Sequence, residues 1–216
     1  MCWNKEVSVV TYVTVMVLVI ILYKRNKGSD RHIALFSAAF VTIQLLEFFA
    51  WLSIENKDKK LNDLITRIIL IALWAQPLVN SLAAMSKSLN PILITGSIIW
   101  GLLFYASIIN ASSPEEFKSE KGPNCHLVWS RNIGGIENKV GEGSFMGDYK
   151  ILTFFYLAGL FIPLLFIKPM KRGIKLAIIG FILLTVSRKM SSKTEFSSYW
   201  CWAAGVFTVS GLLITK

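Results

Sequence analysis

The sequence is poor in the residues from which most catalytic and metal sites are built. It contains two histidines, three cysteines, and 13 acidic residues against 23 lysines and arginines. HExxH, GxSxG and P-loop motifs are missing, and the cysteines lack the spacing of a zinc site. These absences argue against a metallohydrolase, a serine hydrolase and a P-loop nucleotide-binding protein. We therefore expect no metal and no cofactor, and a protein more typical of a non-enzyme than of an enzyme.

Charge is scarce inside the long apolar segments. Hydrophobic residues make up 54% of the chain and charged residues 17%, with a mean hydropathy of +0.54. The apolar runs carry no polar face with a 3.6-residue period, so they are hydrophobic all round, as in helices that lie in lipid. The net charge of +10 comes mostly from residues at the ends of these runs. A membrane interface explains that placement better than nucleic acid does, so the predicted partner is the lipid bilayer and the predicted localisation is multi-pass in the membrane.

Seven apolar runs match the length that a bilayer core requires. The predicted fold is all-α, a polytopic bundle of seven transmembrane helices that forms a single domain over residues 1–216. Basic residues after the first run favour an N-terminus outside and a C-terminus inside. The segment 110–148 is predicted as a long extramembrane loop with a short strand at 126–129. The predicted spans are 7–23, 33–54, 61–85, 92–109, 151–167, 173–187 and 199–215.

An acidic residue, Glu47, lies inside the second predicted span. A charge at that depth is costly and commonly marks a functional site. In the predicted topology Glu47 and Arg67 both lie about 10 Å below the outer face, so we expect them to pair. Two interpretations remain open: transport of an ion or small solute through a polar interior, or an ion pair that only locks helix packing. The predicted polar site consists of Tyr12, Gln44, Glu47, Arg67, Gln76, Asn80 and Tyr156, with a helix kink at Pro77.

The three cysteines all fall on the predicted outer side of the membrane. In an oxidising compartment Cys125 is expected to bond to Cys201 or to Cys2, which leaves one free thiol. Such a cluster keeps a third hypothesis open, a membrane enzyme with thiol-redox or other chemistry at its outer face.

Three segments of the sequence resemble a known group of proteins: 1–8 (MCWNKEVS), 44–51 (QLLEFFAW) and 199–202 (YWCW). They are similar to an uncharacterised family of multi-pass, seven-helix membrane proteins associated with large DNA viruses and unicellular eukaryotes. The resemblance extends over nearly the full chain. It implies a membrane-embedded fold and no assigned activity, and it places the three segments together in one linked site at the outer face.

Overall fold

The computed structural model describes residues 4–86, 89–133, 135–139, 150–192 and 194–214, and most of them are helical. A 3₁₀ helix, η1, spans Ile162–Phe166 directly after α5. The α-helices begin and end close to the bounds of the predicted spans, except that α5 ends at Phe161, well before the predicted end of the fifth span at 167. Their bounds are α1 Lys5–Arg25, α2 Asp30–Glu55, α3 Lys59–Met85, α4 Pro91–Ala111, α5 Lys150–Phe161, α6 Met170–Met190 and α7 Phe196–Leu213.

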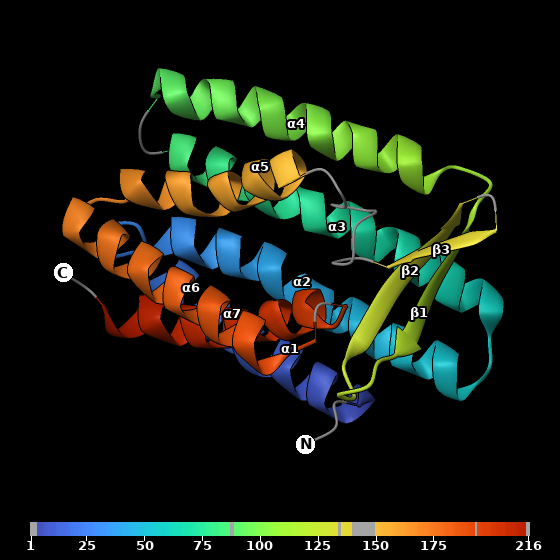
Figure 1. Cartoon of the computed structure of the whole chain (residues 1–216). Helices are drawn as coiled ribbons and strands as arrows, with labels where there is room; N and C mark the ends of the chain where they lie inside the picture. The colour runs from blue at the N-terminus through green and yellow to red at the C-terminus, as the bar shows by residue number, and fades with distance from the viewer. Residues whose placement is uncertain (1–3, 87–88, 134, 140–149, 193, 215–216) are drawn as a thin grey trace.

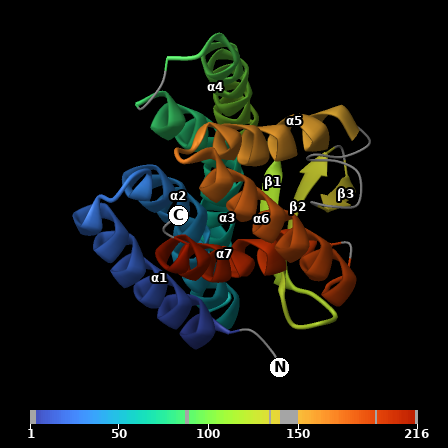
Figure 2. The same cartoon turned by 90° about the vertical axis from the view of Figure 1, so that its left-hand side faces the viewer.

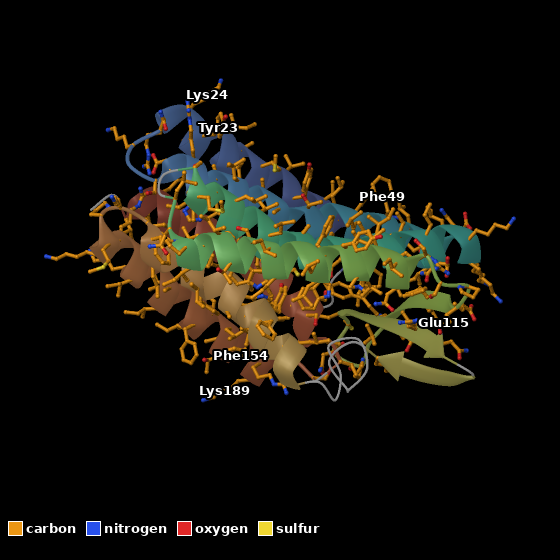
Figure 3. The ribbon with its side chains drawn as sticks, turned by 90° about the horizontal axis from the view of Figure 1, so that it is seen from above. Tyr23, Lys24, Phe49, Glu115, Phe154 and Lys189 are labelled. Atoms are coloured by element: carbon orange, nitrogen blue, oxygen red, sulfur yellow. The ribbon has the colours of Figure 1, made fainter. Side chains whose placement is uncertain are left out.

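The helices form one elongated bundle with two distinct ends (Figures 1 and 2). The first four helices follow each other as antiparallel neighbours, α7 packs against α2, and α5 packs against α3. We call the end that carries the N-terminus of α1 the sheet end, because a small sheet covers it. We call the opposite end, where α1 ends and α2 begins, the Asp30 end. Figure 3 shows Tyr23 and Lys24 at the Asp30 end and Glu115 at the sheet end.

The outer surface of the bundle is apolar over most of its length. Four helices, α1 to α4, are long and apolar enough to cross a membrane. Phe49 and Phe154 project outward from the bundle (Figure 3), and Phe154 is 65% exposed. Apolar side chains exposed in this density are typical of a lipid-facing surface. Further large hydrophobic side chains that are more than half exposed include Val10, Val13, Ile98, Leu102, Phe181 and Ile182.

Aromatic side chains hold α7 against α2 inside the bundle. The rings of Phe36 and Phe207 lie 5.5 Å apart, and those of Phe40 and Trp200 lie 5.6 Å apart, both pairs edge to face. This geometry is favoured by the charge distribution of aromatic rings. These contacts fix the level at which α7 presents its polar residues to α2.

The region predicted as a long loop contains a three-stranded antiparallel sheet. Its strands are β1 Glu116–Lys121, β2 Leu127–Ile133 and β3 Ile136–Lys139, in the order β1-β2-β3. The predicted short strand overlaps the start of β2, while β1 and β3 were missed. Side chains of α3 occupy the free edge of β1: Asn62 Oδ1 accepts from Ser119 N at 2.8 Å, and Asp63 Oδ1 accepts from Phe117 N at 2.8 Å. They satisfy main-chain groups that an unpaired edge would leave exposed.

The fifth predicted span breaks before its end. Pro163 has no N–H, so the carbonyl of Gly159, four residues earlier, loses its usual helical donor. The Asn80 side chain replaces that donor, since its Nδ2 lies 3.0 Å from the Gly159 oxygen and 2.9 Å from the Leu160 oxygen. Asn80 Oδ1 lies 2.8 Å from His32 Nε2. One buried amide on α3 therefore supports both the break in α5 and a histidine on α2.

Gly159 also sets how closely α5 approaches α3. A Cβ at this position would lie 2.4 Å from the Pro77 Cβ, so only glycine fits. Pro77 itself lies within α3, which continues as one helix from Lys59 to Met85. The kink predicted at Pro77 stays a prediction.

Candidate functional site

The Glu47 carboxylate lies in the interior of the bundle. Its side chain is 3% exposed, and Gln44 Nε2 donates to its Oε2 at 2.7 Å. The prediction that Gln44 and Glu47 share one helix face is therefore confirmed. Ser198 on α7 also faces the carboxylate. The other carboxylate oxygen, Oε1, is buried without a hydrogen-bond partner among the described residues.

Polar side chains from three other helices gather beside Glu47. Gln76 on α3 accepts a hydrogen bond from the Tyr156 hydroxyl on α5 at 2.5 Å. The Cys201 thiol on α7 lies close to both Glu47 and Gln76, and Trp200 lies close to Tyr156. Within the described part of the chain, Gln76 Nε2 and Trp200 Nε1 are buried without a hydrogen-bond partner. We call this set the Glu47 cluster: Gln44, Glu47, Gln76, Tyr156, Ser198, Trp200 and Cys201.

Unpartnered polar atoms are uncommon inside a folded protein, and each calls for an explanation. In the Glu47 cluster three buried atoms on three helices, one acceptor and two donors, lack a hydrogen bond of good geometry, although Ser198, Cys201 and Tyr156 lie near the side chains that carry them. Burying a carboxylate without a compensating charge is expensive, so such a group is stable only if it is protonated or binds a cation. The arrangement is suited to holding a proton or a small cation within the bundle.

Arg67 does not pair with Glu47, so the predicted ion pair is wrong. Its guanidinium binds Asp63, one turn earlier on α3, with Nε 2.6 Å from Oδ2. The predicted topology places Arg67 at the same depth as Glu47, but it does not give the direction in which the side chain points. The Arg67 side chain points to the C-terminal end of α4, where unpaired main-chain carbonyls attract a cation. The guanidinium donates there to the main-chain oxygens of Ala111, Ser113 and Glu115.

Two other predicted site residues lie outside the Glu47 cluster. Tyr12 packs against the hydrophobic core from α1 and makes no hydrogen bond to Glu47 within the described residues. Asn80 is engaged with His32 and the α5 carbonyls. Of the predicted residues, Gln44, Glu47, Gln76 and Tyr156 come together. Sequence reasoning missed the contributions of Ser198, Trp200 and Cys201 to this cluster.

The predicted cysteine cluster does not form around Cys201. That thiol is free and completely buried, so the Cys125–Cys201 bridge is excluded. Cys125 lies in the turn between β1 and β2 with a positive φ of 64°. Cys2 lies outside the described residues. Cys201 is buried because it faces the Glu47 cluster from the inner side of α7.

Replacing Glu47 with glutamine is expected to change the free energy of unfolding by less than about 1 kcal/mol. The amide keeps the shape of the carboxyl group, and no described cation is left without its partner when the charge is removed. Chemical denaturation of the purified protein in detergent measures this difference. A loss of several kcal/mol would contradict it and would restore an ion-pair role for Glu47.

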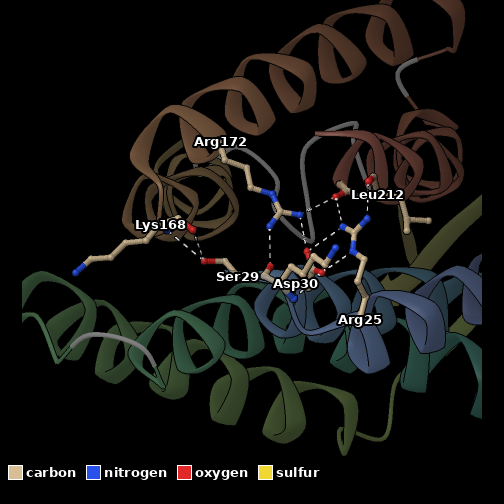
Figure 4. Close-up of polar contacts among 8 residues, drawn as sticks. Arg25, Ser29, Asp30, Lys168, Arg172 and Leu212 are labelled. Atoms are coloured by element: carbon tan, nitrogen blue, oxygen red, sulfur yellow. Dashed lines mark hydrogen bonds and ion pairs between the residues drawn. The ribbon is translucent and has the colours of Figure 1, made fainter. Parts of the chain in front are cut away.

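A second buried charge cluster lies at the Asp30 end, and sequence reasoning missed it (Figure 4). Asp30 is completely buried, with its Oδ2 2.7 Å from Arg25 Nε and its Oδ1 2.6 Å from Arg172. The same arginines donate to the last turn of α7, Arg172 to the Gly211 oxygen at 2.7 Å and Arg25 to the Leu212 oxygen at 2.8 Å. One carboxylate and two guanidinium groups therefore join the ends of α1, α2, α6 and α7. The sequence feature that could have indicated this charge cluster is the single acidic residue in the basic turn KRNKGSDR.

At the sheet end, Glu195 attaches the β1–β2 turn to the start of α7. Its carboxylate accepts from the main-chain nitrogens of Asn124 at 2.7 Å and His126 at 3.1 Å, and from Ser192 Oγ at 2.6 Å. Burial of the Glu195 carboxylate raises its pKa, but these hydrogen bonds lower it by more, so the pKa of Glu195 lies below its ordinary value. A Cβ at Gly122 would lie 2.4 Å from the carboxylate, so any larger residue there would displace the Glu195 side chain.

Acid is expected to weaken the attachment of the sheet. Burial lowers the pKa of His126 from 6.5 to about 4, so between these values the unfolded chain binds a proton that the folded chain does not. Stability should therefore fall as the pH drops through this window, by up to about 3 kcal/mol. Glu195 acts in the same direction, because its pKa is lowered as well. Denaturation curves at about pH 7 and about pH 4.5 measure the loss, and His126→Asn should reduce it; an unchanged pH slope in that variant would contradict the assignment.

No known family model matches the sequence. No characterised protein gives a significant match either. Within the described residues, no group of three or more His, Cys, Asp or Glu side chains could hold a metal ion.

Proposed function

We propose that this chain is a multi-pass membrane protein whose seven helices all cross the bilayer. In this proposal the N-terminus and the sheet end lie outside, and the C-terminus and the Asp30 end lie inside. Support comes from the apolar outer surface and from the distribution of charge. The described basic residues at the Asp30 end are Lys24, Arg25, Lys27, Arg31, Lys168, Lys171, Arg172 and Lys175, and the acidic residue among them is Asp30.

Charges at the sheet end are closer to balance. Exposed pairs there include Lys5 with Glu55 and Lys118 with Glu120. An excess of Lys and Arg in short loops on one side of a membrane is typical of the cytoplasmic side. This asymmetry favours the proposed orientation. A bridge between Cys125 and Cys2 on the outer side belongs to the same proposal, because Cys201 is free.

We further propose that the protein transports protons or a small cation, with Glu47 as the residue that binds them. One observation carries this proposal: Glu47 is buried in the bundle and no described cation pairs with it. Such a carboxyl group can take up and release a proton or cation as its surroundings change. The packing-lock hypothesis required Arg67 as the partner, and Arg67 binds Asp63 instead.

The break between α5 and η1 supports a transport role. Interrupted helices next to a central polar site are a recurring feature of transporters, because they can change shape more readily than continuous ones. Tyr156 lies on α5 before the break, and it contacts Gln76 in the Glu47 cluster. A movement of α5 at the break would therefore act on the Glu47 cluster through Tyr156.

The enzyme hypothesis has less support. Reactive thiols lie in partly exposed, electropositive surroundings, whereas Cys201 is completely buried beside a carboxylate. Flux of protons or cations into vesicles that carry the purified protein tests the transport proposal. Glu47→Gln is expected to stop that flux.

A further inference from the structure

Two turns that are far apart in the sequence are joined at the Asp30 end. The Ser29 hydroxyl donates to the Lys168 oxygen at 3.0 Å and accepts from the Lys168 main-chain nitrogen at 3.2 Å. Arg172 donates to the Lys27 oxygen at 3.2 Å. The turn between α1 and α2 and the turn before α6 therefore form one surface. Figure 4 shows the Lys168 side chain extending from this surface away from Asp30.

The joined turns gather basic side chains for which no acidic partner lies among the described residues. We call the exposed ones the basic rim: Lys24, Lys27, Arg31, Lys168 and Lys171. Among the described residues the carboxylate at this end is that of Asp30, which is buried and already bound by Arg25 and Arg172. Within the described part of the chain, the rim therefore has no carboxylate to neutralise it. A cluster of like charges of this kind attracts anions.

Exposed apolar side chains lie directly beside the basic rim. Tyr23 is 47% exposed and has the Arg31 guanidinium over its ring at 5.1 Å, and Met170 is 64% exposed. Leu35 and Ile174, one turn further into the bundle, are also exposed. This succession from basic to apolar surface matches the succession from headgroup to acyl chain in a lipid leaflet.

We propose that the basic rim binds the phosphate groups of anionic phospholipids. The inference rests on the proposed placement in a bilayer and is independent of the role of Glu47. Lys24 lies at the end of α1 and Arg31 at the start of α2. Lys168 and Lys171 lie on either side of the first residue of α6. The lipid therefore bridges the α1–α2 turn and the α6 start, which the protein itself joins through Ser29 and Arg172. Nucleic acid fits the charge but not the adjacent apolar surface.

Lipid titration of the purified protein in a neutral detergent tests this proposal. Dioleoyl phosphatidylglycerol and dioleoyl phosphatidylcholine are compared by thermal unfolding and by native mass spectrometry of retained lipid. The rim variant combines Lys24→Gln, Lys27→Gln, Lys168→Gln and Lys171→Gln. The matched control removes the same charge from the sheet-end half with Lys59→Gln, Lys60→Gln, Lys121→Gln and Lys189→Gln.

The wild type and the control should bind phosphatidylglycerol about tenfold or more tightly than phosphatidylcholine, and the rim variant should lose this preference. In wild-type protein, about 1 M salt should also remove it, which provides the test if the variant folds poorly. An undiminished preference in the rim variant, or an equal loss in the control, would overturn the proposal. Inorganic phosphate that stabilises the protein as well as the lipid does would overturn the lipid assignment in favour of a free anion.

Discussion

Replacing Asp30 with asparagine is expected to destabilise the protein by about 3–5 kcal/mol. The substitution keeps the size of the side chain but removes its charge, so Arg25 and Arg172 lose their shared carboxylate. Removing one partner of a buried ion pair is far more damaging than removing an exposed one, because the remaining charge stays desolvated. Here the Arg172 side chain is 1% exposed. The loss should loosen α6 and α7 from α1 and α2 at this end of the bundle.

Chemical denaturation in detergent, with Glu55→Gln as a matched control, measures this effect. The control also converts a carboxylate to an amide, but its pair with Lys5 is exposed and should contribute about 0–1 kcal/mol. A double variant with Arg172→Met should recover part of the loss, because it removes one of the stranded charges. Equal stability of Asp30→Asn and wild type would show that the arginines are held by the α7 carbonyls alone.

The positions of the helices could be predicted from the sequence because each one is a continuous apolar run with polar ends. Caps sharpen several boundaries: Asn4, Asp58 and Asn90 each accept a hydrogen bond from the first turn of the helix that follows. The shared face of Gln44 and Glu47 was equally predictable, because residues three apart on a helix lie side by side.

The partners of the charged residues could not be predicted in the same way. A topology gives the depth of a side chain but not its direction around the helix, and this is why Arg67 was paired with Glu47 when it binds Asp63 and the end of α4. Asp30 and Arg172 are 142 positions apart, and no local pattern brings them together. The sheet was missed because β1 has the sequence EFKSEK, in which alternation is short and charge is high.

Loss of transport in Glu47→Gln is the largest functional effect that we expect. The amide cannot take up a proton and binds cations weakly, so flux should fall at least about tenfold. Because this variant is expected to remain as stable as wild type, lost flux would not be a consequence of misfolding. Glu47→Asp keeps a carboxyl group at the site and should retain part of the flux. Glu6→Gln makes the same chemical change on an exposed part of α1 and should leave the flux unchanged.

Proton flux in reconstituted vesicles tests the role of Glu47 most directly. Vesicles that contain wild type, Glu47→Gln or Glu6→Gln carry an internal pH dye, and a potassium gradient with valinomycin sets the driving force. Parallel vesicles with sodium or potassium gradients show whether a cation takes the place of the proton. We predict flux above that of empty vesicles for wild type and Glu6→Gln, and its loss in Glu47→Gln. Equal flux in wild type and Glu47→Gln, or no flux in wild type with any of these ions, would contradict a transport role for the buried carboxylate.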